Sequence, residues 1–144
     1  MLEREWIQAH IPHQDGMCLI DAVEAWSSER IACRATSHRL ESNPLRRDGR
    51  LGAACAIEYA AQAMAIHGAL LGADGQRRRP GYLVSVRGVE LTVMRLDDLD
   101  ADLAIEAERL VAEDARVLYQ FSVRAGQRVL CSGRAAVVLT EEEP

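Results

Sequence analysis

The sequence contains no lysine, because all 17 of its basic residues are arginine. This absence excludes Schiff-base catalysis, a lysine nucleophile and a phosphate-binding P-loop, whose motif ends in glycine and lysine. The GxSxG, HExxH and GxGxxG motifs are also missing, so the large enzyme classes that they mark are excluded. We therefore look for a catalytic base among the four histidines.

Aromatic residues and cysteine pairs are scarce too. Aromatics make up 4% of the chain and the net charge is −5, so we do not expect nucleic acid as a partner. Cys18, Cys33, Cys55 and Cys131 form no CxxC pair and lack a histidine at ligand spacing, which argues against zinc. We expect no metal or other cofactor. The chain begins without a signal sequence, which indicates a cytoplasmic protein with reduced cysteines.

The stretch from residue 51 to residue 72, LGAACAIEYAAQAMAIHGALLG, is the most distinctive part of this 144-residue chain. Its alanine content and its lack of proline predict one long helix. A membrane span has this length. However, half of the segment is alanine or glycine, and a central charge costs about 2.5–3.5 kcal/mol in a membrane. We therefore expect no membrane segment and a single globular domain over residues 1–144.

One stripe of the predicted helix is small and apolar except for Glu58 and Gln62. At about 100° per residue, this stripe contains Leu51, Ala54, Glu58, Ala61, Gln62 and Ala65. An ionised carboxylate is costly to bury without a partner, so a glutamate kept on a buried apolar face is a functional candidate. The alternative, in which Glu58 simply faces solvent, remains open at this point.

Strands are predicted on both sides of this helix, in the order β-β-α-β-β-β-β. Apolar alternation and turn residues place them at 17–25, 30–36, 82–93, 103–111, 117–124 and 128–139. Gly88 is expected to form a bulge or a bend. A helix this apolar needs covering on nearly all sides, so we expect an α+β fold with a curved antiparallel sheet around one long central helix. The long strands leave an exposed edge, which predicts a homodimer or a dimer of dimers.

Three segments together resemble the 3-hydroxyacyl acyl-carrier-protein dehydratases, which have the hotdog fold. Residues 11–13, Ile-Pro-His, with the apolar run and Asp21 that follow, are similar to the opening Leu-Pro-His of that family. Residues 58–62 are similar to its acidic helix motif, Glu-x-x-x-Gln. Residues 81–86 and 99–102 are similar to the strand that lines its acyl tunnel and to the loop beyond.

The loop before the helix departs from that family. The family carries Gly-His-Phe-Pro there, with a catalytic histidine, whereas this chain has no histidine between His38 and His67. The Pro-Gly that precedes the helix in the family is replaced by Gly52 and Ala53. The Asp48-Gly49 version of the loop is most similar to the divergent dehydratase-like proteins of aryl polyene pigment clusters.

The resemblance implies dehydration of a 3-hydroxyacyl thioester, carried on acyl carrier protein or coenzyme A, to the trans-2-enoyl thioester. Glu58 would be the acid, since burial favours its protonated form, Gln62 would orient it or a water, and His13 would be the base. Helix N-terminal amides would stabilise the enolate oxygen. The residues expected to contact the substrate are Asn43, Gly52, Ala53, Tyr82, Val84, Arg46 and Arg47.

Alternatives remain open for the residues and for the function. His38 could enter the site, whereas His67 is expected to pack. The arginines at 46, 47, 50 and 77–79 serve either solubility or docking to a carrier and its phosphate. A hotdog thioesterase could use Glu58 with water, and a non-catalytic acyl-binding subunit could support a dehydratase paralogue. The missing loop histidine favours the non-catalytic subunit.

Overall fold

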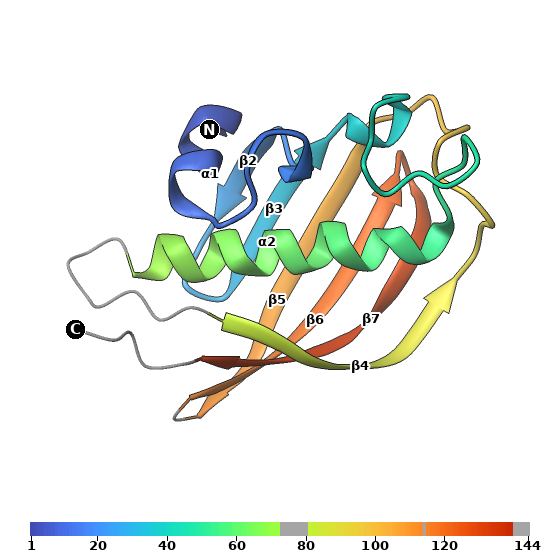
Figure 1. Cartoon of the computed structure of the whole chain (residues 1–144). Coiled ribbons are helices and arrows are strands. Elements are labelled where there is room, and N and C mark those ends of the chain that lie inside the picture. The colour runs from blue at the N-terminus through green and yellow to red at the C-terminus, as the bar shows by residue number, and fades with distance from the viewer. Residues whose placement is uncertain (73–80, 114, 140–144) are drawn as a thin grey trace.

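A long apolar helix, α2 (Ala56–Leu71), lies against a curved antiparallel sheet in the computed structural model (Figure 1). The structure describes residues 1–72, 81–113 and 115–139. The sheet has seven strands in the order β1-β2-β3-β5-β6-β7-β4. Their bounds are β1 Leu2–Glu3, β2 Ala22–Trp26, β3 Arg30–Ala35, β4 Gly81–Leu91, β5 Leu103–Glu113, β6 Arg116–Ala125 and β7 Arg128–Leu139.

This architecture confirms the expected α+β arrangement of one helix wrapped by an antiparallel sheet. A short helix, α1 (Arg4–His10), follows β1, and its Ile7 is fully buried. Gly88 lies at a register shift of β4 with a positive φ of 61°, so the expected bulge is present. The first predicted strand is shorter than expected, because 3-10 helix η1 (Asp15–Met17) occupies its start. Two further 3-10 helices are η2 (Ser37–Arg39) and η3 (Ala53–Cys55).

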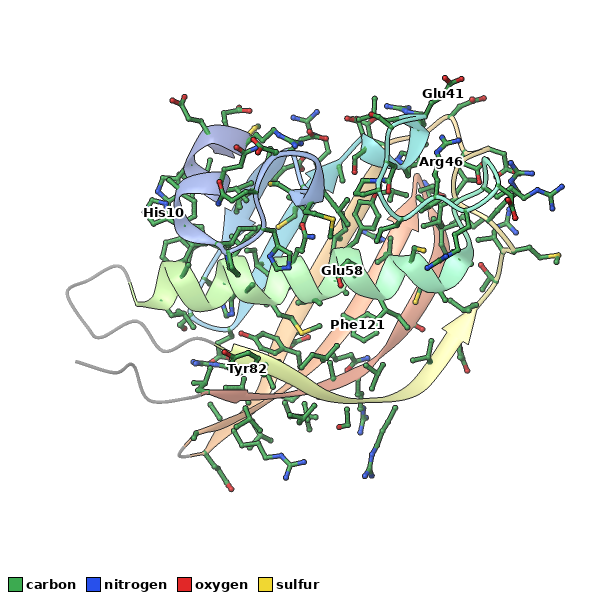
Figure 2. All side chains as sticks on the ribbon, in the orientation of Figure 1. His10, Glu41, Arg46, Glu58, Tyr82 and Phe121 are labelled. Carbon is green, nitrogen blue, oxygen red and sulfur yellow. The ribbon has the colours of Figure 1, made fainter. Side chains whose placement is uncertain are left out.

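Helix α2 buries a different face from the one that we expected. Its large side chains, among them Tyr59, Ile66 and Leu70, pack towards the sheet, and Phe121 of β6 lies between helix and sheet (Figure 2). Within the stripe that holds Glu58, Ala54 is exposed and Glu58, Ala61 and Ala65 are half-buried, whereas Leu51 and Gln62 are buried. The helix is apolar on all sides, so periodicity did not distinguish its faces. The larger side chains turn inward because they bury more apolar area.

By length and composition alone, the segment Ala53–Leu71 would suffice to cross a membrane. In this structure, 56% of that window is buried inside the protein. This is the burial expected of a helix that forms the core of a globular domain.

Two buried histidines, His38 and His67, hold loops in place through hydrogen bonds. Nε2 of His67 donates to the carbonyl oxygen of Ser27 (2.8 Å), and Nδ1 accepts from the Tyr119 hydroxyl (2.7 Å). Nε2 of His38 donates to the carbonyl oxygens of residues 99 and 101. Burial lowers the pKa of both histidines below the usual value. Both side chains are therefore neutral parts of the folded core, and His38 is not available as a catalytic base.

The lowered pKa values predict that stability falls as the solution is acidified. In the unfolded chain these histidines titrate near pH 6.5, at a higher pH than in the folded protein. The unfolded state therefore binds more protons below about pH 6.5, and the free energy of unfolding falls by up to about 1.4 kcal/mol per pH unit for each histidine. Denaturant titrations between about pH 7.5 and 5.5 measure this slope. We expect His38→Gln to flatten it and Gln120→Ala, which removes no titratable group, to leave it unchanged; an unchanged slope in a His38→Gln, His67→Gln double variant would contradict the account.

Strand β4 forms one edge of the sheet, because it pairs with β7 and with no other described strand. Its side chains are exposed on both faces, including Tyr82 at 59% and Val84 at 55%. Figure 2 shows Tyr82 at the start of this strand. A long apolar edge presents free backbone groups to any other strand. Such an edge favours pairing with a second subunit.

We predict that β4 pairs with a strand of a second subunit. Light scattering at about 10 μM should give at least twice the mass of one chain, as a protein with a closed two-fold interface does. Val84→Lys should reduce that mass, because a charge on the edge opposes pairing. Val111→Lys, at an exposed valine away from this edge, is the matched control. A monomeric wild-type chain at this concentration would count decisively against edge pairing.

Candidate active site

Three of the expected site residues meet on the half-exposed side of α2. Nε2 of His13 lies 3.4 Å from Oε1 of Glu58, and Nε2 of Gln62 lies 3.3 Å from the same oxygen. Glu58, labelled on α2 in Figure 2, is one turn away from Gln62 on the same helix. His13 comes from the loop between α1 and η1 of the same chain. The side chains of His13 and Glu58 are 27% and 36% exposed. The fold thus brings these residues together, with Glu58 less buried than we expected.

Gln62 has a single possible orientation. Its Oε1 accepts from the backbone N–H of Leu19 (2.9 Å), and its Nε2 donates to the carbonyl oxygen of Met17 (2.8 Å) as well as to Glu58. Because the Leu19 N–H must face an acceptor, the amide oxygen is fixed on that side and the NH₂ group on the other. The side chain is fully buried. Gln62 therefore ties the loop that carries His13 to the helix that carries Glu58.

The loop around His13 is held on both sides of that residue. Nε2 of Gln14 donates to the carbonyl oxygen of Gln8 (2.6 Å), and a guanidinium nitrogen of Arg4 donates to the carbonyl oxygen of Asp15 (2.7 Å). These bonds join the loop to α1. The position of His13 beside Glu58 is thus set by local contacts as well as by Gln62.

The protonation of His13 is constrained by its second ring nitrogen. Nδ1 is buried and has no hydrogen-bond partner among the described residues. A hydrogen on Nδ1 would leave an unpaired buried donor, which costs about 1–3 kcal/mol. The neutral ring therefore favours its hydrogen on Nε2, the nitrogen that faces the Glu58 carboxyl group.

Asn43 is a structural residue, which corrects the expectation that it contacts the substrate. Its Nδ2 donates to the carbonyl oxygen of Ser37 (2.9 Å) and to the Tyr59 hydroxyl (3.2 Å), while Oδ1 accepts from the Leu45 N–H (2.9 Å). The side chain is buried. Its polar atoms fasten the 37–45 loop to α2, so they are not free to bind a ligand.

The start of the helix also differs from expectation. The N–H of Ala53 donates to the carbonyl oxygen of Met94 (3.1 Å), and that of Cys55 donates to Gly52 (3.0 Å). Ala53 is buried, whereas Gly52 is exposed. The Ala53 amide is therefore occupied and cannot stabilise an enolate oxygen in this arrangement. This correction leaves Gly52 as the accessible residue of the two.

The two arginines expected to bind substrate have different environments. The guanidinium of Arg46 donates to the carbonyl oxygens of Gly49 (3.0 Å) and His38 (3.3 Å), so it stabilises its own loop (Figure 2). Arg47 is exposed and has no ion pair within the part of the chain that the structure describes. The arginines at 77–79 lie outside the described residues. Arg47 is thus the expected contact that remains free for a ligand.

Asp97, which the sequence analysis missed, anchors the segment that leads into η3 and α2. Its Oδ1 accepts from the N–H of Leu51 (2.8 Å), 46 positions away in the chain. The Arg95 guanidinium beside it holds the pKa of Asp97 well below its usual range. Only the two-residue spacing of Arg95 and Asp97 could have suggested their pairing. Among the described residues, no three His, Cys, Asp or Glu side chains are grouped to hold a metal ion.

The chain is similar to known dehydratases and thioesterases. The ApeP-like family model, described as ApeP dehydratase, matches residues 6–143. The solved dehydratase heterocomplex ApeI:P from Xenorhabdus doucetiae has a TM-score of 0.83 and 21% identity, covering 94% of this chain and 91% of that one.

Solved thioesterases share the fold at lower similarity. A mutant of thioesterase PA1618 from Pseudomonas aeruginosa has a TM-score of 0.68 and 14% identity, covering 97% of this chain and 99% of that one. Thioesterase HI1161 from Haemophilus influenzae has a TM-score of 0.62 and 10% identity, covering 85% and 78%. These similarities show the hotdog fold that we expected from the sequence. No curated protein has a significantly similar sequence.

The contacts of Gln62 predict a large stability cost for its removal. Gln62→Ala leaves the Leu19 N–H and the Met17 carbonyl without their partner, so the free energy of unfolding should fall by about 2–4 kcal/mol. Gln120→Ala, which removes an exposed glutamine from β6, is the control and should change it by less than about 0.5 kcal/mol. Equilibrium denaturation compares the two variants. Equal stabilities would mean that Gln62 does not hold the loop.

Proposed function

Because this chain belongs to the ApeP-like family of dehydratases, we propose that it removes water from a 3-hydroxyacyl thioester to give the trans-2-enoyl thioester. The observation that carries this proposal is the 3.4 Å contact between His13 and Glu58. The elimination breaks a C–H bond at Cα and a C–O bond at the adjacent carbon. A base and an acid that serve adjacent atoms must themselves be neighbours, as these two side chains are.

An ion pair of the Glu58 carboxylate with a protonated His13 would give the proton transfers a definite direction. The carboxylate takes the proton from Cα, and the His13 imidazolium gives its Nε2 proton to the departing hydroxyl group and becomes neutral. The electron pair of the C–H bond becomes the double bond, and water leaves. Glu58 then returns a proton to His13 across their contact, which restores the pair. This direction reverses the one expected from the sequence, in which His13 was the base and Glu58 the acid.

A second subunit is part of this proposal. Glu58 and His13 are partly exposed in one chain, and the apolar side chains of Ala61 and Ala65 lie half-exposed on the same side of α2. Covering this side would exclude water and strengthen the electrostatic interactions of the pair. The solved ApeI:P complex is a dehydratase heterocomplex. The covering subunit is accordingly a second copy of this chain or a dehydratase paralogue, and Tyr82 and Val84 of β4 would line the enclosed acyl channel.

The proposed substrate is an acyl group carried on acyl carrier protein or coenzyme A. Both carriers present a phosphate, which arginine binds well. Arg47 and Arg50, in the loop that leads to the helix, are exposed and have no ion pair within the described ranges. The four cysteines are free, which fits the cytoplasmic location that we propose.

Acyl thioester hydrolysis is the second candidate function. The observation in its favour is the shared fold with solved thioesterases. In that reaction, the Glu58 carboxylate would activate a water molecule that attacks the thioester carbonyl, and the thiol would leave. A non-catalytic accessory role is the third candidate, and it requires only that the apolar side of α2 binds acyl groups or a paralogue.

Substitutions at the pair separate these functions. With a carrier-bound 3-hydroxyacyl thioester, we expect Glu58→Gln and His13→Gln each to reduce dehydration by about 10²-fold or more, since each removes one proton transfer. His10→Gln, in the preceding helix, is the control and should keep the rate within about threefold. Mass spectrometry follows the enoyl product, and a thiol reagent follows hydrolysis.

Each function has its own outcome in this assay. Release of free thiol without enoyl product would identify the reaction as hydrolysis instead of dehydration. A wild-type chain that was inactive alone but raised the activity of a dehydratase paralogue would indicate the accessory role. If Glu58→Gln kept the full dehydration rate, Glu58 would not be a catalytic residue.

A further inference from the structure

A groove of about 1000 Å³ lies on the outer face of the sheet. Its floor belongs to β6 and β7, and its sides belong to β4 and β5. Leu118 and Gln120 line it, and they alternate along β6 with the buried residues Val117, Tyr119 and Phe121, which face α2. The groove is thus on the opposite side of the sheet from Glu58 and His13, and the dehydratase site does not account for it.

Two arginines face each other across one end of this groove. Arg87 of β4 is the direct cross-strand partner of Arg134 of β7. Neither guanidinium has an ion pair with any described residue. Like charges directly opposite on a sheet are destabilising. An anion between the two side chains would remove this repulsion.

Hydrogen-bond donors surround the same end. Gln120 of β6 is the cross-strand partner of Arg134 on its other side, and Ser132 and Ser85 also line the groove. Glu90 of β4, beyond the arginines, is the cross-strand partner of Ser132 and lines the groove as well. Guanidinium groups bind carboxylate and phosphate through two parallel bonds, and neutral donors complete the contacts of such a group. The chemistry of this end therefore suits a compact oxyanion.

The backbone holds Arg87 in place. The bulge at Gly88 bends β4 directly after this arginine. Gly133 allows a close approach of the strands, because a Cβ atom there would meet the side chain of Phe121 at 3.0 Å and the carbonyl oxygen of Arg87 at 3.3 Å. The two glycines thus shape the backbone of β4 and β7 next to the two arginines.

The other part of the groove has an apolar floor. Two residues beyond Arg134 on the same face of β7 is Ala136, which pairs with Leu118, and two residues further is Val138. At about 3.4 Å per residue, these positions lie about 7 and 14 Å from the arginine. Val111 of β5 lines the same part. The floor of the groove therefore changes from cationic to apolar over the length of a short hydrocarbon chain, and Arg116 and Glu113 line the groove at the Val138 end.

We propose that this groove binds a small amphipathic anion, a carboxylate or phosphate attached to a short apolar chain. The anion lies between Arg87 and Arg134 and the chain extends over Leu118 and Ala136. This binding does not depend on the dehydratase reaction, because no residue of the His13 site takes part in it.

Titration calorimetry with octanoate, octyl phosphate and uncharged octanol tests the proposal on the full chain. We expect saturable binding of at least one anion and weaker binding of octanol. The double variant Arg87→Gln, Arg134→Gln should weaken anion binding by about tenfold or more, because it removes two charge-assisted contacts. Arg128→Gln, the same exchange outside the groove, should leave it unchanged. Comparing the first two ligands distinguishes a carboxylate site from a phosphate site.

Glu58→Gln separates this groove from the dehydratase site, and we expect it to bind the anion as the wild type does. Anion binding that survived in the double arginine variant, or that was lost in Glu58→Gln, would overturn the proposal. So would the absence of saturable binding by either anion. A lower assembly mass of the double variant in light scattering would show that a second subunit covers the groove, which would also overturn it.

Discussion

The side-chain amide of Gln62 is the interaction on which the site depends. It is buried on α2, and its three hydrogen bonds join Glu58 to the 17–19 segment that follows the His13 loop. If the Gln62 amide were flipped, its NH₂ group would face the Leu19 N–H, and two hydrogen-bond donors would meet. The fold therefore allows only one orientation of this amide. Glu58 and His13 therefore keep a fixed separation although both are partly exposed. Neither Glu58 nor His13 could keep this separation without Gln62.

A second constraint comes from the apolar character of α2 on all sides. The sheet covers the side that carries Tyr59, Ile66 and Leu70. Within the described ranges, the loop that carries His13 covers the side with Glu58 only in part, because the Glu58 side chain stays 36% exposed. The same chain leaves β4 as an apolar edge. A second subunit would both cover the Glu58 side of α2 and pair with the β4 edge. Assembly would therefore also complete the proposed site.

The sequence predicted the fold well because its signals are local and repeated. Alanine content and length marked α2, alternation marked the strands, and the spacing of Glu58 and Gln62 placed both on one stripe. The roles of Asn43, Ala53 and the Arg46 side chain were not predictable in this way. Their partners are backbone groups of loops whose positions follow from the tertiary fold. The buried side of α2 was mistaken for the same reason, since an apolar helix takes its orientation from the surface that it meets.

The central claim is that Glu58 takes the proton from Cα while His13 serves the hydroxyl group. Deuterium uptake tests it most directly, with a saturated acyl thioester that has an α-hydrogen and no hydroxyl to lose, incubated with the assembled protein in D₂O. Mass spectrometry then counts deuterium at Cα, which requires the base alone. We predict uptake with the wild type and with His13→Gln, and none above background with Glu58→Gln. Uptake by Glu58→Gln at the wild-type rate would contradict the account.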